Sequence, residues 1–71
     1  MEDYQIRLKN EHDELRSKYV ELTAFIYGQE QKLSNVGIGN SSLMLLKQQR
    51  TFMKRYLDVL EKRCILEGIK L

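Results

Sequence analysis

The chain has 71 residues, with 12 Lys and Arg against 10 Asp and Glu, one Cys, one His, no Pro and a formal net charge of +2. This length allows one domain, residues 1–71, and the lone Cys and His exclude a disulfide framework and a tetrahedral zinc site within one chain. No apolar run reaches the roughly 18 residues of a membrane span, and the acidic start predicts no secretory signal. A chain of this size buries only a small core, so we predict that oligomerisation adds to its stability.

Residues 3–34 place side chains at heptad spacing, which predicts a long helix with an apolar face. Two rows of positions form this face, which we call the a/d seam: Gln5, His12, Tyr19, Ile26 and Leu33 at a, and Leu8, Leu15, Leu22 and Gln29 at d. Asp3 is placed to cap the start of the helix. Residues 1–34 hold seven acids and five Lys or Arg, a net charge of −2.

Residues 35–41 interrupt the helical pattern with Gly37, Gly39 and a polar cluster. A phosphate-binding loop would follow a strand and carry a Gly-Lys pair, whereas this segment follows a helix and contains no Lys. We therefore interpret it as a turn that reverses the chain. Asn40, Ser41 or Ser42 would cap the helix that follows.

Residues 42–68 predict a second helix with its own a/d seam. The a positions are Leu43, Arg50, Leu57, Cys64 and Leu71, and the d positions are Leu46, Met53, Leu60 and Glu67. Gly68 would loosen its end. Residues 42–71 hold seven Lys or Arg and three acids, a net charge of +4, and residues 47–55 hold four of these cations without an acid.

The second helix has another apolar stripe, which lies about 110° around the helix from its seam. It is formed by heptad positions c and g: Leu45, Phe52, Val59 and Leu66 at c, with Gln49, Tyr56 and Arg63 at g. One face can pack on the first helix in an antiparallel hairpin, and nothing else in the chain covers the other. We expect other copies to bury it, so the predicted fold is all-α, an antiparallel two-helix hairpin assembled into a homo-oligomeric helical bundle.

Two residues with reactive side chains lie on the seams and favour packing over catalysis. His12 has no Ser, Cys or carboxylate placed to form a catalytic set with it, and Cys64 is interpreted as a small buried apolar residue. The acids of the first helix are interpreted as surface charges that pair along it, such as Glu14 with Lys18. We therefore predict no enzyme, no cofactor and no metal.

Four other side chains are candidates for anion or base recognition. Arg50 stands at an a position, where it either reaches a Glu of the first helix or faces a polar cavity that binds an anion. Arg63 lies on the stripe and can pair with an acid of a neighbour or line a shared pocket. Tyr4 and Arg7 stand one turn apart at the chain start, where an aromatic face and a guanidinium fork suit base stacking and phosphate capture. A frayed first turn is the alternative.

The patterns RLKNExxELRxKYxxLxAFI and LLKQQxxFMxxYLxVLExR cover nearly the whole chain. Together they resemble the hairpin domain of small phage proteins that sequester cyclic nucleotides, the anti-CBASS and anti-Thoeris sponges. The matching positions are Arg7, Glu11, Leu15, Leu22, Phe25, Ile26, Leu45, Leu46, Gln49, Met53, Tyr56, Leu60 and Arg63. Gln49, Tyr56 and Arg63 are less generic than the packing residues.

The resemblance implies a homo-oligomer, with a hexamer favoured, that binds cyclic di- or trinucleotides between protomers and does not cleave them. Binding would silence a bacterial immune effector in the cytoplasm of the infected host. Tyr4 is the counterpart of a base-stacking Tyr, and Lys18, Lys47, Arg50 and Arg63 are the candidate cations. Some relatives use an extra C-terminal domain for ADP-ribose-type ligands, which this sequence lacks, so cyclic oligonucleotides are the better expectation.

Two rival hypotheses fit parts of the same pattern. A helical-hairpin scaffold that pairs with a partner helix would use the same heptads and stripe without a small ligand. A nucleic-acid accessory protein would use residues 47–55 on backbone phosphates, although generic duplex binding requires a more basic domain. We expect neither duplex nucleic acid nor a membrane as a partner.

Overall fold

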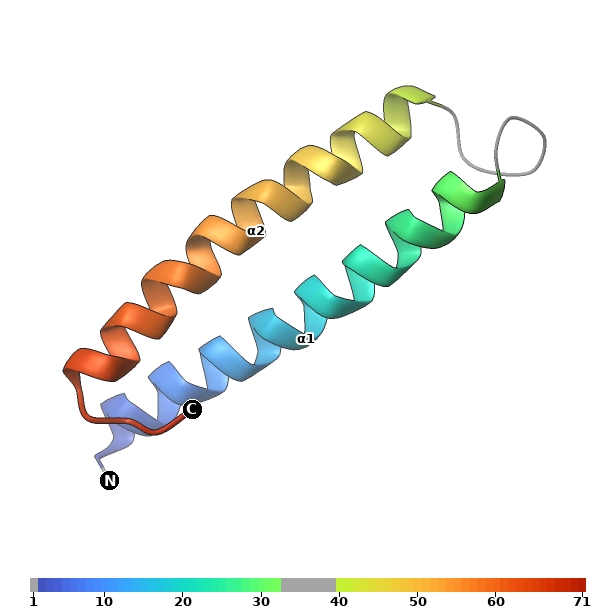
Figure 1. Cartoon of the computed structure of the whole chain (residues 1–71). Coiled ribbons are helices and arrows are strands. Elements are labelled where there is room, and N and C mark those ends of the chain that lie inside the picture. The colour runs from blue at the N-terminus through green and yellow to red at the C-terminus, as the bar shows by residue number, and fades with distance from the viewer. Residues whose placement is uncertain (1, 33–39) are drawn as a thin grey trace.

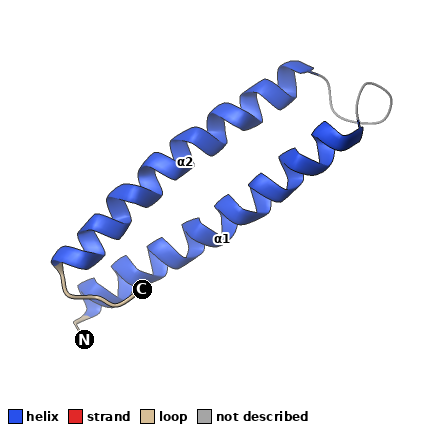
Figure 2. Ribbon diagram, viewed as in Figure 1, coloured by secondary structure: helices blue, strands red, loops and turns tan. Residues whose placement is uncertain are grey.

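The computed structural model describes residues 2–32 and 40–71, which form two antiparallel helices (Figure 1). Helix α1 spans Asp3–Lys32 and helix α2 spans Asn40–Leu66. They pack side by side along their length, with both chain termini at the same end. The Cα atoms extend 50 × 14 × 14 Å. The predicted all-α hairpin is confirmed, and the described residues contain helices and loop only (Figure 2).

The ends of the helices differ in detail from the expectation. The Glu2 carbonyl accepts the first helical bond, from the Ile6 N–H at 3.0 Å, so Glu2 rather than Asp3 is the N-cap of α1. The Gln5 side chain accepts from the Glu2 N–H at 3.2 Å, which is half of a capping box. Helix α2 begins at Asn40, so Ser41 lies inside it rather than in the predicted turn, and it ends at Leu66 rather than 68. The rest of that turn, with Leu33, lies outside the described residues.

The predicted a/d seams form the contact between the helices. In residues 3–32 and 41–66, every buried side chain is at a seam position: Leu8, His12 and Ile26 on α1, and Leu57, Leu60 and Cys64 on α2. Removing each large aliphatic side chain from water contributes about 1.5–3 kcal/mol. The seam therefore accounts for the pairing of the helices, and the 3.5-residue repeat keeps it facing the partner helix along the rod.

The end of α2 closes on the core through a turn that sequence reasoning missed. Gly68 has a φ of +72°, and its N–H donates to the Ile65 carbonyl while the Ile69 N–H donates to the Cys64 carbonyl, at 3.0 and 2.9 Å. These two bonds form a Schellman motif. It returns Ile69 to the helix pair, where Ile69 is buried against Leu8 and Cys64. Gly68 therefore ends α2 with the left-handed backbone conformation that a Schellman motif requires.

Replacing Gly68 with alanine is expected to lower the free energy of unfolding by about 1 kcal/mol, because a Cβ disfavours its positive φ. The matched control is Gly28→Ala within α1, where helix propensity predicts a gain of up to about 1 kcal/mol. A Cβ meets nothing within 4 Å at either position, so only backbone conformation separates the two variants. Urea denaturation followed by circular dichroism measures both, and equal effects would contradict the motif.

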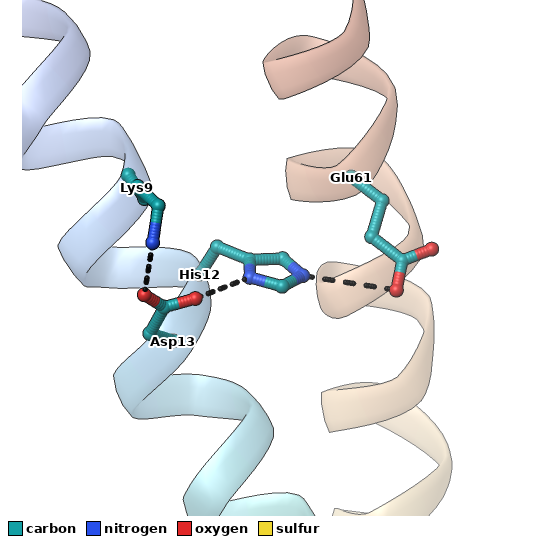
Figure 3. Close-up of polar contacts among 4 residues, drawn as sticks. All are labelled: Lys9, His12, Asp13 and Glu61. Atoms are coloured by element: carbon teal, nitrogen blue, oxygen red, sulfur yellow. Dashed lines mark hydrogen bonds and ion pairs between the residues drawn. The ribbon is translucent and has the colours of Figure 1, made fainter. Parts of the chain in front are cut away.

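His12 is the buried polar residue of the seam, and it stands between carboxylates of both helices (Figure 3). Its Nδ1 lies 3.0 Å from Oδ1 of Asp13, and its Nε2 lies 3.7 Å from Oε1 of Glu61 on α2. Lys9 Nζ approaches Oδ2 of Asp13 at 2.9 Å. The bonds from His12 and then Lys9 hold the pKa of Asp13 below its ordinary value. The expectation that no carboxylate stands beside His12 is therefore wrong, although Nε2 of His12 has no hydrogen-bond partner among the described residues.

The contacts of Asp13 predict a loss of stability in acid. The pKa of Asp13 is lower in the folded chain than in the unfolded chain, so the unfolded chain binds more protons in acid. The carboxylate therefore stabilises the fold above its ordinary pKa of 3.8, and this stabilisation is lost as the pH falls through the folded pKa. Half of the Asp13 side chain is exposed, so we expect less than about 1 kcal/mol. Urea denaturation between pH 7 and pH 2 should show this loss in the wild type and not in Asp13→Asn. Glu21→Gln, an exposed acid of the same helix, is the control.

The apolar part of the second stripe of α2 is not covered by α1, as the heptad pattern predicted. Its large apolar members are all exposed: Leu45, Phe52, Tyr56, Val59 and Leu66. The two helices pack against each other along the a/d seam, so these apolar side chains of the stripe stay exposed to water. Among the described residues, neither helix is long and apolar enough to span a bilayer.

Candidate ligand-binding site

Three of the six predicted site residues meet at the end of the hairpin that holds both chain termini. Tyr4 and Arg7 from the start of α1 and Arg63 from the end of α2 line one cleft of about 280 Å³, together with Leu8 and Glu11. The antiparallel arrangement brings the first and last helical turns together. The cleft therefore combines an aromatic ring, two guanidinium groups and a carboxylate over a buried Leu.

A hydrogen bond joins the two helices across this cleft. Arg63 Nη2 donates to the Tyr4 hydroxyl oxygen at 3.1 Å, between residues 59 positions apart. The same bond, and attraction to the Tyr4 oxygen, raise the pKa of Arg63 above its ordinary value, so its positive charge persists at all physiological pH. A guanidinium has five N–H donors. Arg63 therefore keeps donors for an anion while Tyr4 is held in place.

Side-chain hydrogen bonds of Gln5 hold the first turn of α1, for which the sequence left a frayed end as the alternative. Gln5 Nε2 donates to the Glu67 carbonyl at 3.1 Å, which ties α1 to the segment after α2. The Gln5 side chain also accepts the hydrogen bond from the Glu2 N–H. Tyr4 lies within the same turn, and its hydroxyl is held by Arg63.

The other three predicted cations do not join this cleft. Lys47 lies near the opposite end of the hairpin, where its Nζ stands 3.4 Å from Oε1 of Glu30. Lys18 is exposed in the middle of α1. Arg50 is half-buried, and among residues 2–32 and 40–71 it forms no ion pair with an acid of α1. Within one chain, Tyr4, Arg7 and Arg63 are the candidates that line the cleft.

Two apolar grooves lie on the outside of the helices. The groove on α2 follows the stripe and is lined by Leu45, Gln48, Gln49, Phe52, Met53 and Tyr56. The groove on α1, lined by Tyr19, Val20, Thr23, Ala24 and Tyr27, was missed by sequence reasoning. Its signal was the repeat of exposed apolar residues at Val20 and Tyr27, one heptad apart. Each helix therefore leaves large apolar side chains exposed on its outer face.

A protein-family model described as Sequestin matches residues 2–65. The chain belongs to the Sequestin family. The match includes all of α1, α2 as far as Ile65, and all six predicted site residues. No curated protein and no solved structure matches the chain. The Sequestin name points to a function in sequestering a ligand or a partner, in keeping with a cleft of binding groups at the shared end of the two helices.

The remaining reactive group of this Sequestin hairpin is a packing residue. Cys64 is a free, buried cysteine, and desolvation by burial raises its thiol pKa. The neutral thiol is a poor nucleophile and belongs to the core cluster with Leu8 and Leu60. Among the described residues, no group of three or more His, Cys, Asp or Glu is placed to hold a metal ion.

Proposed function

We propose that this Sequestin chain binds cyclic oligonucleotide immune messengers and sequesters them without cleavage, as a phage protein acting in the cytoplasm of the infected bacterium. Its binding site is the cleft of Tyr4, Arg7 and Arg63, and its working form is a homo-oligomer, with a hexamer favoured. Sequestration lowers the free messenger and so blocks the immune effector of a CBASS-type system. The resemblance to phage sponges supports the ligand class and the hexamer.

The observation that carries the proposal is the contact of Tyr4 with Arg63 beside Arg7. An aromatic ring stacks on a base through its π-face, and base–aromatic stacking contributes about 1–3 kcal/mol per base. Guanidinium groups pair with phosphate oxygens through two parallel N–H bonds. A ligand that joins bases to phosphates within a few ångströms uses both kinds of group at once, as cyclic oligonucleotides do.

Charge and size explain why the proposal includes several copies. Two Arg and one Glu line the cleft, a net charge of +1, whereas a cyclic dinucleotide carries about two negative charges. The cleft of about 280 Å³ also falls below the roughly 300–1,000 Å³ of pockets that enclose small ligands. Two clefts brought together by two copies would double the net positive charge and the volume. Symmetric assembly repeats every such site. The exposed stripe of α2 offers the surface for assembly.

The placement of two reactive side chains supports binding without cleavage. The nucleophile and base candidates, Cys64 and His12, are buried between the helices and do not line the cleft. Inhibition by sequestration then depends on affinity and abundance, and nanomolar affinity corresponds to about 12 kcal/mol.

A panel of cyclic di- and trinucleotides in thermal-shift and calorimetric assays tests this function. We expect at least one ligand to raise the melting temperature through linkage, and to be recovered intact. Arg63→Ala should weaken its binding by about tenfold or more, and Arg63→Lys should restore only part of it because the fork is lost. Lys62→Ala removes a cation from the neighbouring position, outside the cleft, and should leave binding unchanged. A panel without any binder would overturn the proposal.

A scaffold that binds only a partner helix is the second candidate, favoured by the exposed groove along α2. Such a protein would show no shift with any cyclic nucleotide. Duplex binding through residues 47–55 is less favoured, because Lys47 and Lys54 are already paired with Glu30 and Asp58. A steep salt dependence on random duplex would support it.

A further inference from the structure

We propose that the α1 groove of one copy receives the α2 groove of a second copy that points in the same direction, so that identical hairpins pack side by side. This inference rests on the homo-oligomer of the proposed function and names the two surfaces that form it. Both grooves are apolar and similar in size, about 450 Å³ for the α1 groove and about 500 Å³ for the α2 groove.

The two grooves lie on opposite faces of the hairpin. The hydrogen bond from Arg63 to Tyr4 joins g positions at one edge of the seam, and the ion pair of Lys47 with Glu30 joins e positions at the other edge. Most residues of the α2 groove occupy c and g positions, beside the first edge, whereas most of the α1 groove occupies b and e positions, beside the second. A contact between the grooves is therefore heterologous, and it links each copy to a different neighbour on each face.

The exposed apolar side chains of the two helices also match in level along the rod. Gln5 reaches the Glu67 carbonyl and His12 lies beside Glu61, so residues at one level have numbers that add to 72 or 73. The b positions of α1 and the c positions of α2 obey the same rule. They form three apolar pairs, all exposed in one hairpin: Leu45 with Tyr27, Phe52 with Val20, and Leu66 with Ile6. The fourth pair sets Val59 against Asp13, whose carboxylate is already bound by Lys9 and His12.

This match fixes the direction of the second copy. Residues 19–27 and 45–56, which span the two grooves, both lie toward the end of the hairpin opposite the chain termini (Figure 1). The grooves therefore meet only when both copies point the same way. An inverted copy would instead bring Asp13 level with Phe52 and bury a carboxylate against an aromatic ring. Copies that share one direction place every Tyr4–Arg63 cleft at the same end of the assembly.

The charges beside the grooves favour this pairing over a contact between two α2 stripes. Positions c, f and g of α2 hold three exposed cations and no acid: Arg55, Lys62 and Arg63. Positions b and c of α1 from 13 to 28 hold three exposed acids and no cation: Asp13, Glu14 and Glu21. Two facing stripes would bring like charges together, whereas α1 against α2 brings opposite charges together, which favours binding.

Mixing two variants that each have one damaged groove tests this contact. Phe52→Asp damages the α2 groove and keeps the α1 groove, and Tyr27→Asp does the reverse. We expect each variant alone to be a monomer, with self-association weakened by about 100-fold or more. An equimolar mixture should form a heterodimer through the two intact grooves and nothing larger, because the other two grooves both carry the new charge. Sedimentation velocity measures the size, and native mass spectrometry measures the composition.

The control is Ile65→Asp, which places the same charge at an exposed residue in neither groove and should assemble like the wild type. Circular dichroism checks that the helices are kept, and Leu45→Asp with Val20→Asp is a second pair if a first variant unfolds. A Tyr27→Asp variant that assembles by itself, or a mixture that stays monomeric, would overturn the contact between α1 and α2 and leave ligand binding intact. A monomeric wild type would overturn the homo-oligomer of the proposed function, and this inference with it.

Discussion

Replacing Leu60 with alanine is expected to lower the free energy of unfolding by about 2–5 kcal/mol, the usual cost of truncating a buried Leu. Leu60 is 0 % exposed and packs with Leu8, Cys64 and Ile69 in the core cluster. A domain of this size has about 4–10 kcal/mol of stability in total. With two helices and one seam, few neighbours can move into the cavity. The variant should therefore lose a large share of its total stability and unfold at a much lower urea concentration than the wild type.

Urea denaturation followed by circular dichroism, at a constant protein concentration, measures this effect. The matched control is Ile65→Ala, one turn further along α2, where the side chain is 70 % exposed. We expect that control to change stability by no more than about 0.5 kcal/mol. Similar losses in both variants would mean that Leu60 does not carry the helix contact seen here.

The second large effect is expected on assembly. In the proposed homo-oligomer, Phe52→Asp should shift the protein to a monomer, weakening self-association by about 100-fold or more. Phe52 is 63 % exposed in the α2 groove beside Leu45 and Tyr56, so a second copy would bury it at the centre of the stripe. Buried aromatic residues dominate binding energy at interfaces, and an unpaired carboxylate there adds a large desolvation cost.

Sedimentation velocity at micromolar concentration distinguishes the two forms. Circular dichroism should show helix retained in Phe52→Asp, because Phe52 lies outside the core cluster. Tyr27→Asp places the same charge in the α1 groove, at a side chain that is 66 % exposed. Dissociation of both variants would assign both grooves to interfaces. A wild type that is already monomeric would contradict assembly through the stripe.

The proposed assembly and the candidate site are linked through α2. Arg63 lies on the same g line as Tyr56 and Gln49, which border the α2 groove, so a copy seated on the stripe would stand beside the cleft. Loss of assembly in Phe52→Asp should therefore also weaken ligand binding. Binding that survives in the monomer would show that one hairpin holds the ligand by itself.

Heptad periodicity determined most of the fold, because it is a local property of each helix. The a and d positions predicted which side chains meet, and Leu8, Ile26, Leu57, Leu60 and Cys64 are buried there. Periodicity also predicted that the c positions of α2 stay exposed. The cap at Glu2 and the return of Ile69 escaped prediction, because they depend on backbone hydrogen bonds of single residues rather than on a repeat.

The site was decided by the tertiary structure. Chain pattern proposed Tyr4, Arg7, Arg50 and Arg63, and the resemblance to phage sponges added Lys18 and Lys47. Pattern could not choose among the cations, since every exposed Lys or Arg on a helix looks alike from sequence. Which of them meet depends on how far the antiparallel helices slide past each other, and that register follows from the packing of the whole seam. It brings Arg63 to Tyr4, while the same register places Lys47 against Glu30 at the far end. The amino-acid sequence thus determined the faces of the helices, and their packing selected the residues that share a cleft.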